Sequence, residues 1–420
     1  MNMTRTLCAA LLAAACWTTQ LGAQQPPTQR QLDSLAAQVR QLRARVDSLL
    51  AASRAGGGAQ PAAAAAPGDE LARLRAAASQ AAGGGARDTT AAADTMARAI
   101  GRERNQAQLN PEIGATGDVR VYATTAGVQQ DNFEPREFEV GFQSALDPYS
   151  HTKIFLSFEN DHVGVEEGYL YWIGLPGHMR LDLGKYRQQF GELNRWHLHA
   201  VPETEYPLAL TSYFGADGLA GTGLSLYRAF GGFGTHEVTL QVTGSESDAE
   251  LFGNSGRITY LGHLLNFWQL SRSTYMQLGF SGLYGTNPDS AMKTGVGGLD
   301  FRLTWRPPAE ALYREWTLRG ELLALHKQIA GTGPTRLGGY VSSTYKLNQR
   351  WIAGVRYDYV ESPEFGQITQ QIIPTLTLWE SEWVFLRGQY RWQRVAGETA
   401  TNQFAIQAVW AIGPHKHETY

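Results

Sequence analysis

The sequence contains very little cysteine. Of its 420 residues only Cys8 and Cys16 are cysteines, and both lie within the first twenty positions. The rest of the chain can therefore form no disulfide, no thiolate metal site and no catalytic site built on cysteine.

Long apolar runs are equally scarce. Beyond the N-terminus, no stretch of about eighteen apolar residues is available to cross a membrane as a helix. The mean hydropathy of -0.30 and the formal net charge of -3 would ordinarily indicate a soluble protein. They do not exclude a transmembrane β-barrel, because only alternate residues of a barrel strand face lipid.

Residues 1–23 predict a secretory signal peptide. Arg5 supplies the positive start, residues 7–17 form the apolar stretch, and Leu21-Gly22-Ala23 is a small-residue cleavage site. We therefore expect an exported protein whose mature chain begins near Gln24. A lipoprotein acylated at Cys16 is the alternative.

Two segments of different composition follow. In residues 24–54, leucine and valine recur at alternating spacings of three and four, the a/d seam of a coiled coil: Leu32, Leu35, Val39, Leu42, Val46 and Leu49. This predicts a short periplasmic coiled coil, and a lone amphipathic helix on another surface stays open because under three heptads are marginal in water. Residues 55–109 are rich in alanine and glycine and predict a linker.

Residues 110–420 carry about sixteen segments in which apolar and polar side chains alternate. For example, Leu299, Phe301 and Leu303 alternate with Asp300 and Arg302. The segments usually run for about eight to twelve residues, which suits a tilted strand that crosses a bilayer. The pattern predicts an all-β fold, namely an antiparallel transmembrane β-barrel of about sixteen strands.

The tryptophans favour a membrane barrel over a soluble β-sandwich. Eight of them sit beside every second connection of the strand count, and these connections are mostly short: Trp172, Trp268, Trp305, Trp316, Trp351, Trp379, Trp383 and Trp410. A membrane interface favours indole rings at one end of a barrel, whereas a soluble fold does not. We expect this end to be periplasmic, because periplasmic turns are short.

One connection is far longer than the others. Alternation stops at about residues 190–220, and a loop of this length in an ordered chain is usually functional or disordered. Its aromatic side chains Trp196, Tyr206, Tyr213 and Phe214 need burial that an external loop would lack. We therefore expect it to fold inward and to narrow a pore.

Two histidine pairs have the spacing at which imidazoles share one face of a strand. They are His197 with His199 and His415 with His417. No third ligand lies nearby in the sequence, and two ligands are weak support for a metal. We expect no metal site.

The sequence also gives no sign of catalysis. Glu203 and Glu205 could form a carboxylate pair, but neither a nucleophile nor an orienting base accompanies them. No glycine loop for phosphate binding precedes a helix, so we expect neither an enzyme nor a cofactor.

Residues 166–172 and 180–191 resemble the phosphate-selective porin O and P family. The closing residues 404–410 and the terminal Tyr420 are similar to the last strand of an outer-membrane protein. The resemblance spans residues 110–420. It implies a sixteen-stranded homotrimeric porin of a Gram-negative-type outer membrane, with lipid around it and a third external loop folded into the lumen. The N-terminal segment would then lie in the periplasm, and no nucleic acid would be a partner.

The charges differ from what this resemblance implies. Phosphate-selective members are expected to place lysines at the constriction and an arginine ladder along the wall. Here residues 190–220 contain Arg195 as their only cation, against Glu192, Glu203, Glu205 and Asp217. We expect charges at a narrow neck to outweigh those on a wide wall, because low-dielectric walls focus their field and salt screens the others.

These patterns predict a porin for passive diffusion of small hydrophilic solutes or ions, with weak selectivity. An anion-selective or phosphate-selective porin is the first alternative, and a barrel-anchored enzyme or adhesin the second; a periplasmic tether is a weaker reading. The candidates for the pore lining and the constriction are Arg180, Asp182, Lys185, Arg187, Arg195, Glu203, Glu205, Asp300, Arg302, Arg319, Glu321, Arg356, Asp358, Arg387 and Arg391.

Overall fold

The computed structural model describes residues 111–127, 132–159, 162–247, 249, 251–252, 258–287, 292–328 and 333–413. The expected signal peptide, coiled coil and linker lie outside these residues, as do His415, His417 and Tyr420. Within the described part of the chain, no helix is long and apolar enough to cross a membrane.

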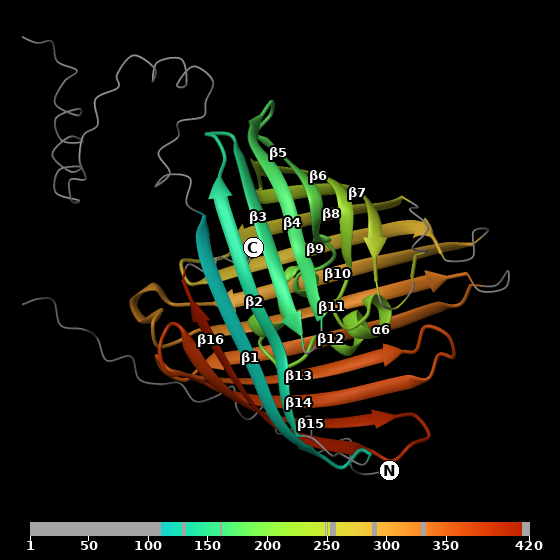
Figure 1. The fold of residues 1–420 in the computed structure, drawn as a ribbon. Helices are drawn as coiled ribbons and strands as arrows, with labels where there is room; N and C mark the ends of the chain where they lie inside the picture. Colours follow the sequence, from blue (N-terminus) through green and yellow to red (C-terminus); the bar gives the residue numbers. More distant parts are fainter. Residues whose placement is uncertain are drawn as a thin grey trace, which may run out of the picture. The chain divides into compact units, whose positions relative to one another are not determined.

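Sixteen antiparallel strands form one closed barrel, which confirms the fold expected from the sequence (Figure 1). Each strand pairs with the next in sequence, and β1 closes the ring against β16. The strands are β1 (Glu112–Thr124), β2 (Phe133–Ala145), β3 (Ser150–Glu159), β4 (His162–Leu175), β5 (Met179–Arg187), β6 (Ala220–Gly232), β7 (Gly234–Glu246), β8 (Thr259–Gln269), β9 (Thr274–Thr286), β10 (Lys293–Trp305), β11 (Trp316–Lys327), β12 (Thr335–Lys346), β13 (Trp351–Glu361), β14 (Ile368–Trp379), β15 (Val384–Val395) and β16 (Thr401–Ile412).

Alternation along each strand gives the barrel an apolar outside and a polar inside. On β16, Gln403 and Gln407 are buried in the interior, whereas Phe404 and Ile406 are about half exposed on the outer wall. Because a soluble sheet buries its apolar face and exposes its polar one, the reverse arrangement fits strands that face lipid.

The eight tryptophans lie at one end of the barrel. They sit at the ends of strands next to the connections β4–β5, β8–β9, β10–β11, β12–β13 and β14–β15, and near the end of β16. Since neighbouring strands are antiparallel, these alternate connections share one rim, which we call the tryptophan end. The register pairs Trp305 directly with Trp316 there, and the 3-10 helix η3 (Pro308–Glu310) lies in the connection that follows.

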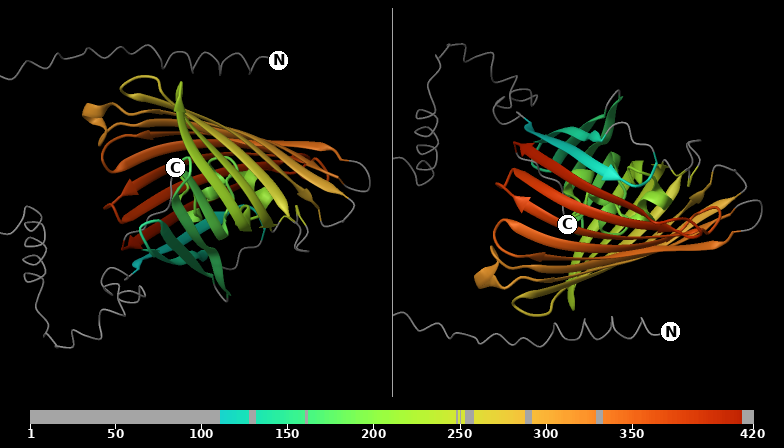
Figure 2. Two further views of the ribbon diagram at one scale, coloured as in Figure 1. Left: turned by 90° about the horizontal axis from the view of Figure 1, so that it is seen from above. Right: turned by 90° about the horizontal axis from the view of Figure 1, so that it is seen from below.

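The connection between β5 and β6, residues 188–219, lies inside the ring of strands (Figure 2). We call it the lumen segment. It contains the 3-10 helices η1 (Leu193–Arg195) and η2 (Leu198–Ala200) and the short helix α6 (Leu208–Phe214). Helix α6 packs against β12 and β13.

The main hydrophobic core of the described residues is formed where the lumen segment meets the wall. Phe190, Leu193, Leu210 and Phe214 of the segment are almost completely buried. They pack with inward apolar side chains of the strands and of the β7–β8 connection, among them Leu251, Phe252, Leu261, Leu283, Val296, Leu323, Leu325, Tyr340 and Val360. Apolar burial therefore fixes the segment across the interior.

Candidate constriction site

The two ends of the lumen segment are fastened together by Asn194. Its side-chain amide donates hydrogen bonds to the backbone oxygens of Gln188 (2.8 Å) and Leu219 (2.9 Å), and its oxygen accepts one from the Leu219 N–H (2.7 Å). Arg187, at the end of β5, pairs with Glu166 and donates to the backbone oxygen of Asp217. The segment therefore begins and ends at one fixed point on the wall.

The first turn of the segment is held by Glu321 of β11. One oxygen of this carboxylate accepts hydrogen bonds from the backbone N–H groups of Glu192 (3.2 Å) and Leu193 (2.9 Å) and from the Tyr340 hydroxyl (3.0 Å). Gly191 precedes this turn with φ at +60°, and an added Cβ would lie 2.0 Å from Glu321 Oε2. Glycine is thus required twice over at this position, by the backbone conformation and by the close approach.

Two carboxylates of the segment reach arginines on β10, β11 and β13. Glu192 lies 2.8 Å from Arg302 and 3.6 Å from Arg319. Glu203 forms a 2.7 Å ion pair with Arg356, and both side chains are completely buried.

Around Glu203 the wall also binds the backbone of the segment. Arg356 donates to the Glu205 oxygen (2.8 Å), Arg387 donates to the Glu203 oxygen (2.8 Å), and Gln389 accepts from the Thr204 N–H (2.9 Å). Asp358 pairs with Arg356 at 2.9 Å. Buried charges of this kind are stable only when paired and hydrogen-bonded.

Glu205 is partly exposed and bridges two arginines. Its two oxygens lie 2.6 Å from Arg391 and 2.6 Å from Arg120, which also pairs with Glu134. Burial by itself would raise the pKa of Glu205, but the two arginines outweigh it and hold that pKa below its usual range.

His197 and His199 bind the wall at β2 and β4. His197 Nδ1 lies 2.5 Å from Glu139 and 3.1 Å from Glu166, and His199 Nδ1 lies 3.0 Å from Glu137. Burial by itself would lower both imidazole pKa values; the neighbouring carboxylates outweigh it, raising the pKa of His197 well above its usual value and that of His199 as well.

The glutamates around His197 were missed by the sequence reasoning, which looked for a third ligand only nearby in the chain. Glu137, Glu139 and Glu166 come from strands tens of residues earlier, and together with His197 they form the one set of potential metal ligands found among the described residues. Their shared inward face was a usable signal, because Glu137 and Glu139 alternate with the outward Phe138.

Comparisons of the sequence with known proteins give little similarity. No family model matches the chain. A protein of Aquifex aeolicus that carries the name "uncharacterized protein" is 25% identical over 306 residues, which cover 63% of this chain and 63% of that protein, so the match spans less than two thirds of its length.

Among solved structures, OprB of Pseudomonas putida superposes with a TM-score of 0.52 at 8% identity, covering 75% of this chain and 97% of that one. A loop-deletion mutant of OmpT from Vibrio cholerae gives 0.51 at 10%, covering 72% and 99%. OmpF of Salmonella typhi, in complex with daunomycin, gives 0.50 at 10%, covering 74% and 100%. The chain has the fold of an outer-membrane porin.

Within this porin fold, the fifteen candidate residues divide by burial. Eight of them are buried, and most bind the lumen segment or one another: Arg187, Glu203, Asp300, Arg319, Glu321, Arg356, Asp358 and Arg387. Asp300 and Glu321 lie opposite each other on β10 and β11. Seven of the eight take part in hydrogen bonds or ion pairs between the lumen segment and the wall, and we assign these seven to fastening the segment; the eighth is Asp300.

The other seven candidates are partly exposed: Arg180, Asp182, Lys185, Arg195, Glu205, Arg302 and Arg391. Arg180 and Asp182 pair at 2.7 Å and, with Arg195, line a cavity of about 90 Å³ between the segment and β4–β7. Lys185 pairs with Glu246 at 2.9 Å, and both line a cavity of about 230 Å³ on the other side of Arg187. Polar space thus remains beside the segment.

Proposed function

We propose that the protein is an outer-membrane porin, a water-filled channel through which small hydrophilic solutes or ions diffuse passively. The observation that carries the proposal is the lumen segment, which crosses the barrel interior and is bound to the wall by charged side chains from several strands. An inward loop fixed in this way narrows the polar interior, and a narrow interior limits the size and charge of a permeating solute.

Weak ion selectivity follows from the pairing of charges. Glu192, Glu203 and Glu205 of the segment each lie within 4.0 Å of at least one wall arginine. The carboxylates of the segment and the arginines of the wall therefore neutralise each other and do not compete across the lumen. A surface of closely paired charges has a weak field beyond the Debye length of about 8 Å at physiological salt.

The finer reading, a phosphate-selective porin as in the family that the sequence resembles, is the alternative. The arginines of the wall favour it, and their pairing with carboxylates speaks against it. We further propose a Gram-negative-type outer membrane as the location, with residues 24–109 in the periplasm, and a homotrimer as the assembly.

Conductance in planar bilayers tests the channel and the constriction together. Replacing residues 190–218 by a tight turn is expected to raise the single-channel conductance, because it removes the obstruction. Folding of the shortened chain is checked by circular dichroism. Absence of channels in the wild-type protein would refute the channel itself, and an unchanged conductance in a folded short-loop variant would refute the constriction.

Reversal potentials under a potassium chloride gradient test the selectivity. We expect the wild type to show only a small preference, and Glu205→Gln to shift the potential toward chloride because it removes a partly exposed negative charge. Glu310→Gln, at the tryptophan end, is the matched control and is expected to have no effect. Strong chloride preference in the wild type, with block by low phosphate, would favour the phosphate-selective alternative.

A further inference from the structure

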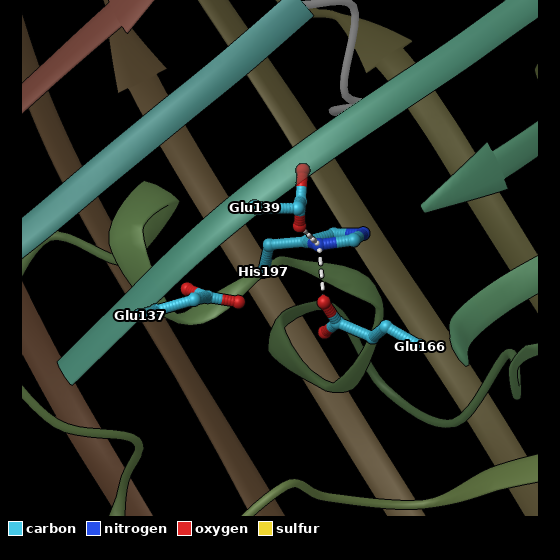
Figure 3. A group of neighbouring side chains, drawn as sticks. All are labelled: Glu137, Glu139, Glu166 and His197. Atoms are coloured by element: carbon cyan, nitrogen blue, oxygen red, sulfur yellow. Dashed lines mark hydrogen bonds and ion pairs between the residues drawn. The ribbon is translucent and has the colours of Figure 1, made fainter. Parts of the chain in front are cut away.

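The strongest unassigned cluster lies where the lumen segment meets β2 and β4 (Figure 3). His197 projects from the segment between Glu139 of β2 and Glu166 of β4, and Glu137 lies to one side of them. Each of the four residues offers one ligand atom, and all four atoms lie within 4.8 Å of one another. His197 and Glu139 are almost completely shielded from solvent.

The nitrogen at the centre of the cluster has too few protons for its neighbours. His197 Nδ1 faces Glu139 Oε2 at 2.5 Å and Glu166 Oε2 at 3.1 Å. One nitrogen carries at most one hydrogen, and Glu139 is the nearer of the two carboxylates. Within the described part of the chain, the buried Glu166 Oε2 has the 3.1 Å ion pair with His197 but no well-aligned hydrogen bond, an arrangement that a bound cation would stabilise.

The opposite oxygen of Glu166 is already used. Glu166 Oε1 accepts from Arg187, so the carboxylate is held in place with Oε2 turned toward His197. Glu137 is oriented in a similar way, because His199 Nδ1 lies 3.0 Å from its Oε2. Metal ligands are typically positioned by outer partners of this kind, whose hydrogen bonds fix the ligand's direction.

We propose that His197, Glu139, Glu166 and Glu137 bind one divalent transition-metal ion that fastens the lumen segment to β2 and β4. One imidazole nitrogen with three carboxylate oxygens suits zinc, manganese or iron(II) better than magnesium, because imidazole is a poor magnesium ligand. In a tetrahedral zinc site with bonds of about 2.0 to 2.2 Å, neighbouring ligand atoms lie about 3.4 Å apart. The four ligand atoms, which lie within 4.8 Å of one another, would move closer together when the ion binds.

Zinc is the probe ion, and the test uses the full-length protein in detergent. His415 and His417 are changed to glutamine in every sample, because that pair could bind zinc independently. Equilibrium dialysis is expected to find one zinc ion per chain at low micromolar free zinc, unaffected by a large excess of magnesium. X-ray absorption at the zinc edge is expected to show one imidazole and oxygen ligands at about 2.0 to 2.2 Å.

Substitutions locate the ion. Glu139→Gln and His197→Gln each remove one ligand with little change in size, and each is expected to weaken zinc binding by at least about tenfold. Glu246→Gln is the control, since Glu246 is a half-exposed carboxylate at the end of β7 that pairs with Lys185, and this variant should bind zinc as the parent does. Folding of each variant is checked by the heat-dependent gel mobility of the barrel.

Several results would overturn the site. They are less than stoichiometric zinc in the parent protein, an absorption spectrum without imidazole, or undiminished binding by both ligand variants. The cluster would then be an ion-pair network in which His197 carries a proton between the two carboxylates. Zinc binding is measured without any current, so its failure leaves the channel proposal untouched, and a failed channel leaves the zinc measurement interpretable.

Discussion

Gly191, at the start of the lumen segment, occupies a position that a residue with a side chain would not fit. Its φ of +60° lies in the left-handed region, and its missing side chain leaves room for the Glu321 carboxylate. That carboxylate in turn binds the N–H groups of the next two residues. The first turn of the segment therefore requires a residue without a Cβ at position 191.

Gly191→Ala is expected to destabilise the barrel by about 1 to 3 kcal/mol, because it combines left-handed strain with displacement of Glu321. The melting temperature in detergent measures the effect. Gly297→Ala is the control, since a Cβ there meets no atom within 4 Å and the φ is not positive. Equal melting temperatures for Gly191→Ala and Gly297→Ala would show that the turn tolerates a side chain.

Glu205 should make stability depend on acid pH. Its arginine partners hold its folded-state pKa below the unfolded value of about 4.3. The stabilisation is therefore fully present above that unfolded value and is lost as the pH falls through the lower folded-state pKa. Glu205→Gln should lower the melting temperature at pH 7, and the difference from wild type should shrink below about pH 4. A difference that stays constant with pH would contradict the ion-pair role.

At the scale of elements, the lumen segment is bound to the barrel at several places. Asn194 joins its two ends, His197 binds Glu139 of β2, Glu203 binds Arg356 of β13, and helix α6 packs on β12 and β13. The helix is too short to be stable by itself. Its position is therefore set by the wall, through the buried faces of Leu210 and Phe214.

The buried network at Glu203 and Arg356 should dominate this attachment. Arg356→Met strands the carboxylates of Glu203 and Asp358 in the interior and is expected to cost about 3 to 5 kcal/mol. Adding Glu203→Gln removes one stranded charge, so the double variant should be more stable than Arg356→Met. Urea unfolding in detergent measures both.

The control for these two variants is Arg314→Met. Arg314 pairs with Glu310 on the exposed surface at the tryptophan end, where such pairs contribute at most about 1 kcal/mol. If the double variant unfolds at the same urea concentration as Arg356→Met, the charges of Glu203 and Arg356 do not couple the segment to β13.

At the scale of the whole molecule, the fold reverses the usual placement of polar and apolar groups. The outer wall is lined with exposed apolar side chains such as Leu240, Leu322 and Phe404, and the interior contains both a hydrophobic core and dense ion pairs. Lipid can cover such a wall, and so can further copies of the chain.

We predict a trimer in which the barrel wall supplies most of the contact. Native mass spectrometry of the full-length protein should find three chains. Deleting residues 31–54, which contain the heptad pattern, should weaken the trimer without abolishing it, because the segment is under three heptads long and cannot hold three chains together by itself. A monomeric full-length protein would refute the assembly.

The sequence by itself determined the barrel. A side-chain period of two, repeated in about sixteen segments, specifies strands with two different faces, and local alternation needs no knowledge of distant residues. The tryptophan end followed for the same reason, since each indole lies next to its own turn. The sequence also marked residues 190–220 as unusual, because alternation ceased there.

Only the tertiary structure decided what the charges do. Glu203 meets Arg356, 153 residues away, and His197 meets Glu139, 58 residues away. Such pairs depend on the course of the lumen segment across the barrel interior. That course cannot be derived from the composition or from the side-chain periodicity of the sequence. Counting charges on the segment and on the wall separately predicted two opposing fields. Folding brings them within hydrogen-bonding distance, where they neutralise each other and hold the segment in place.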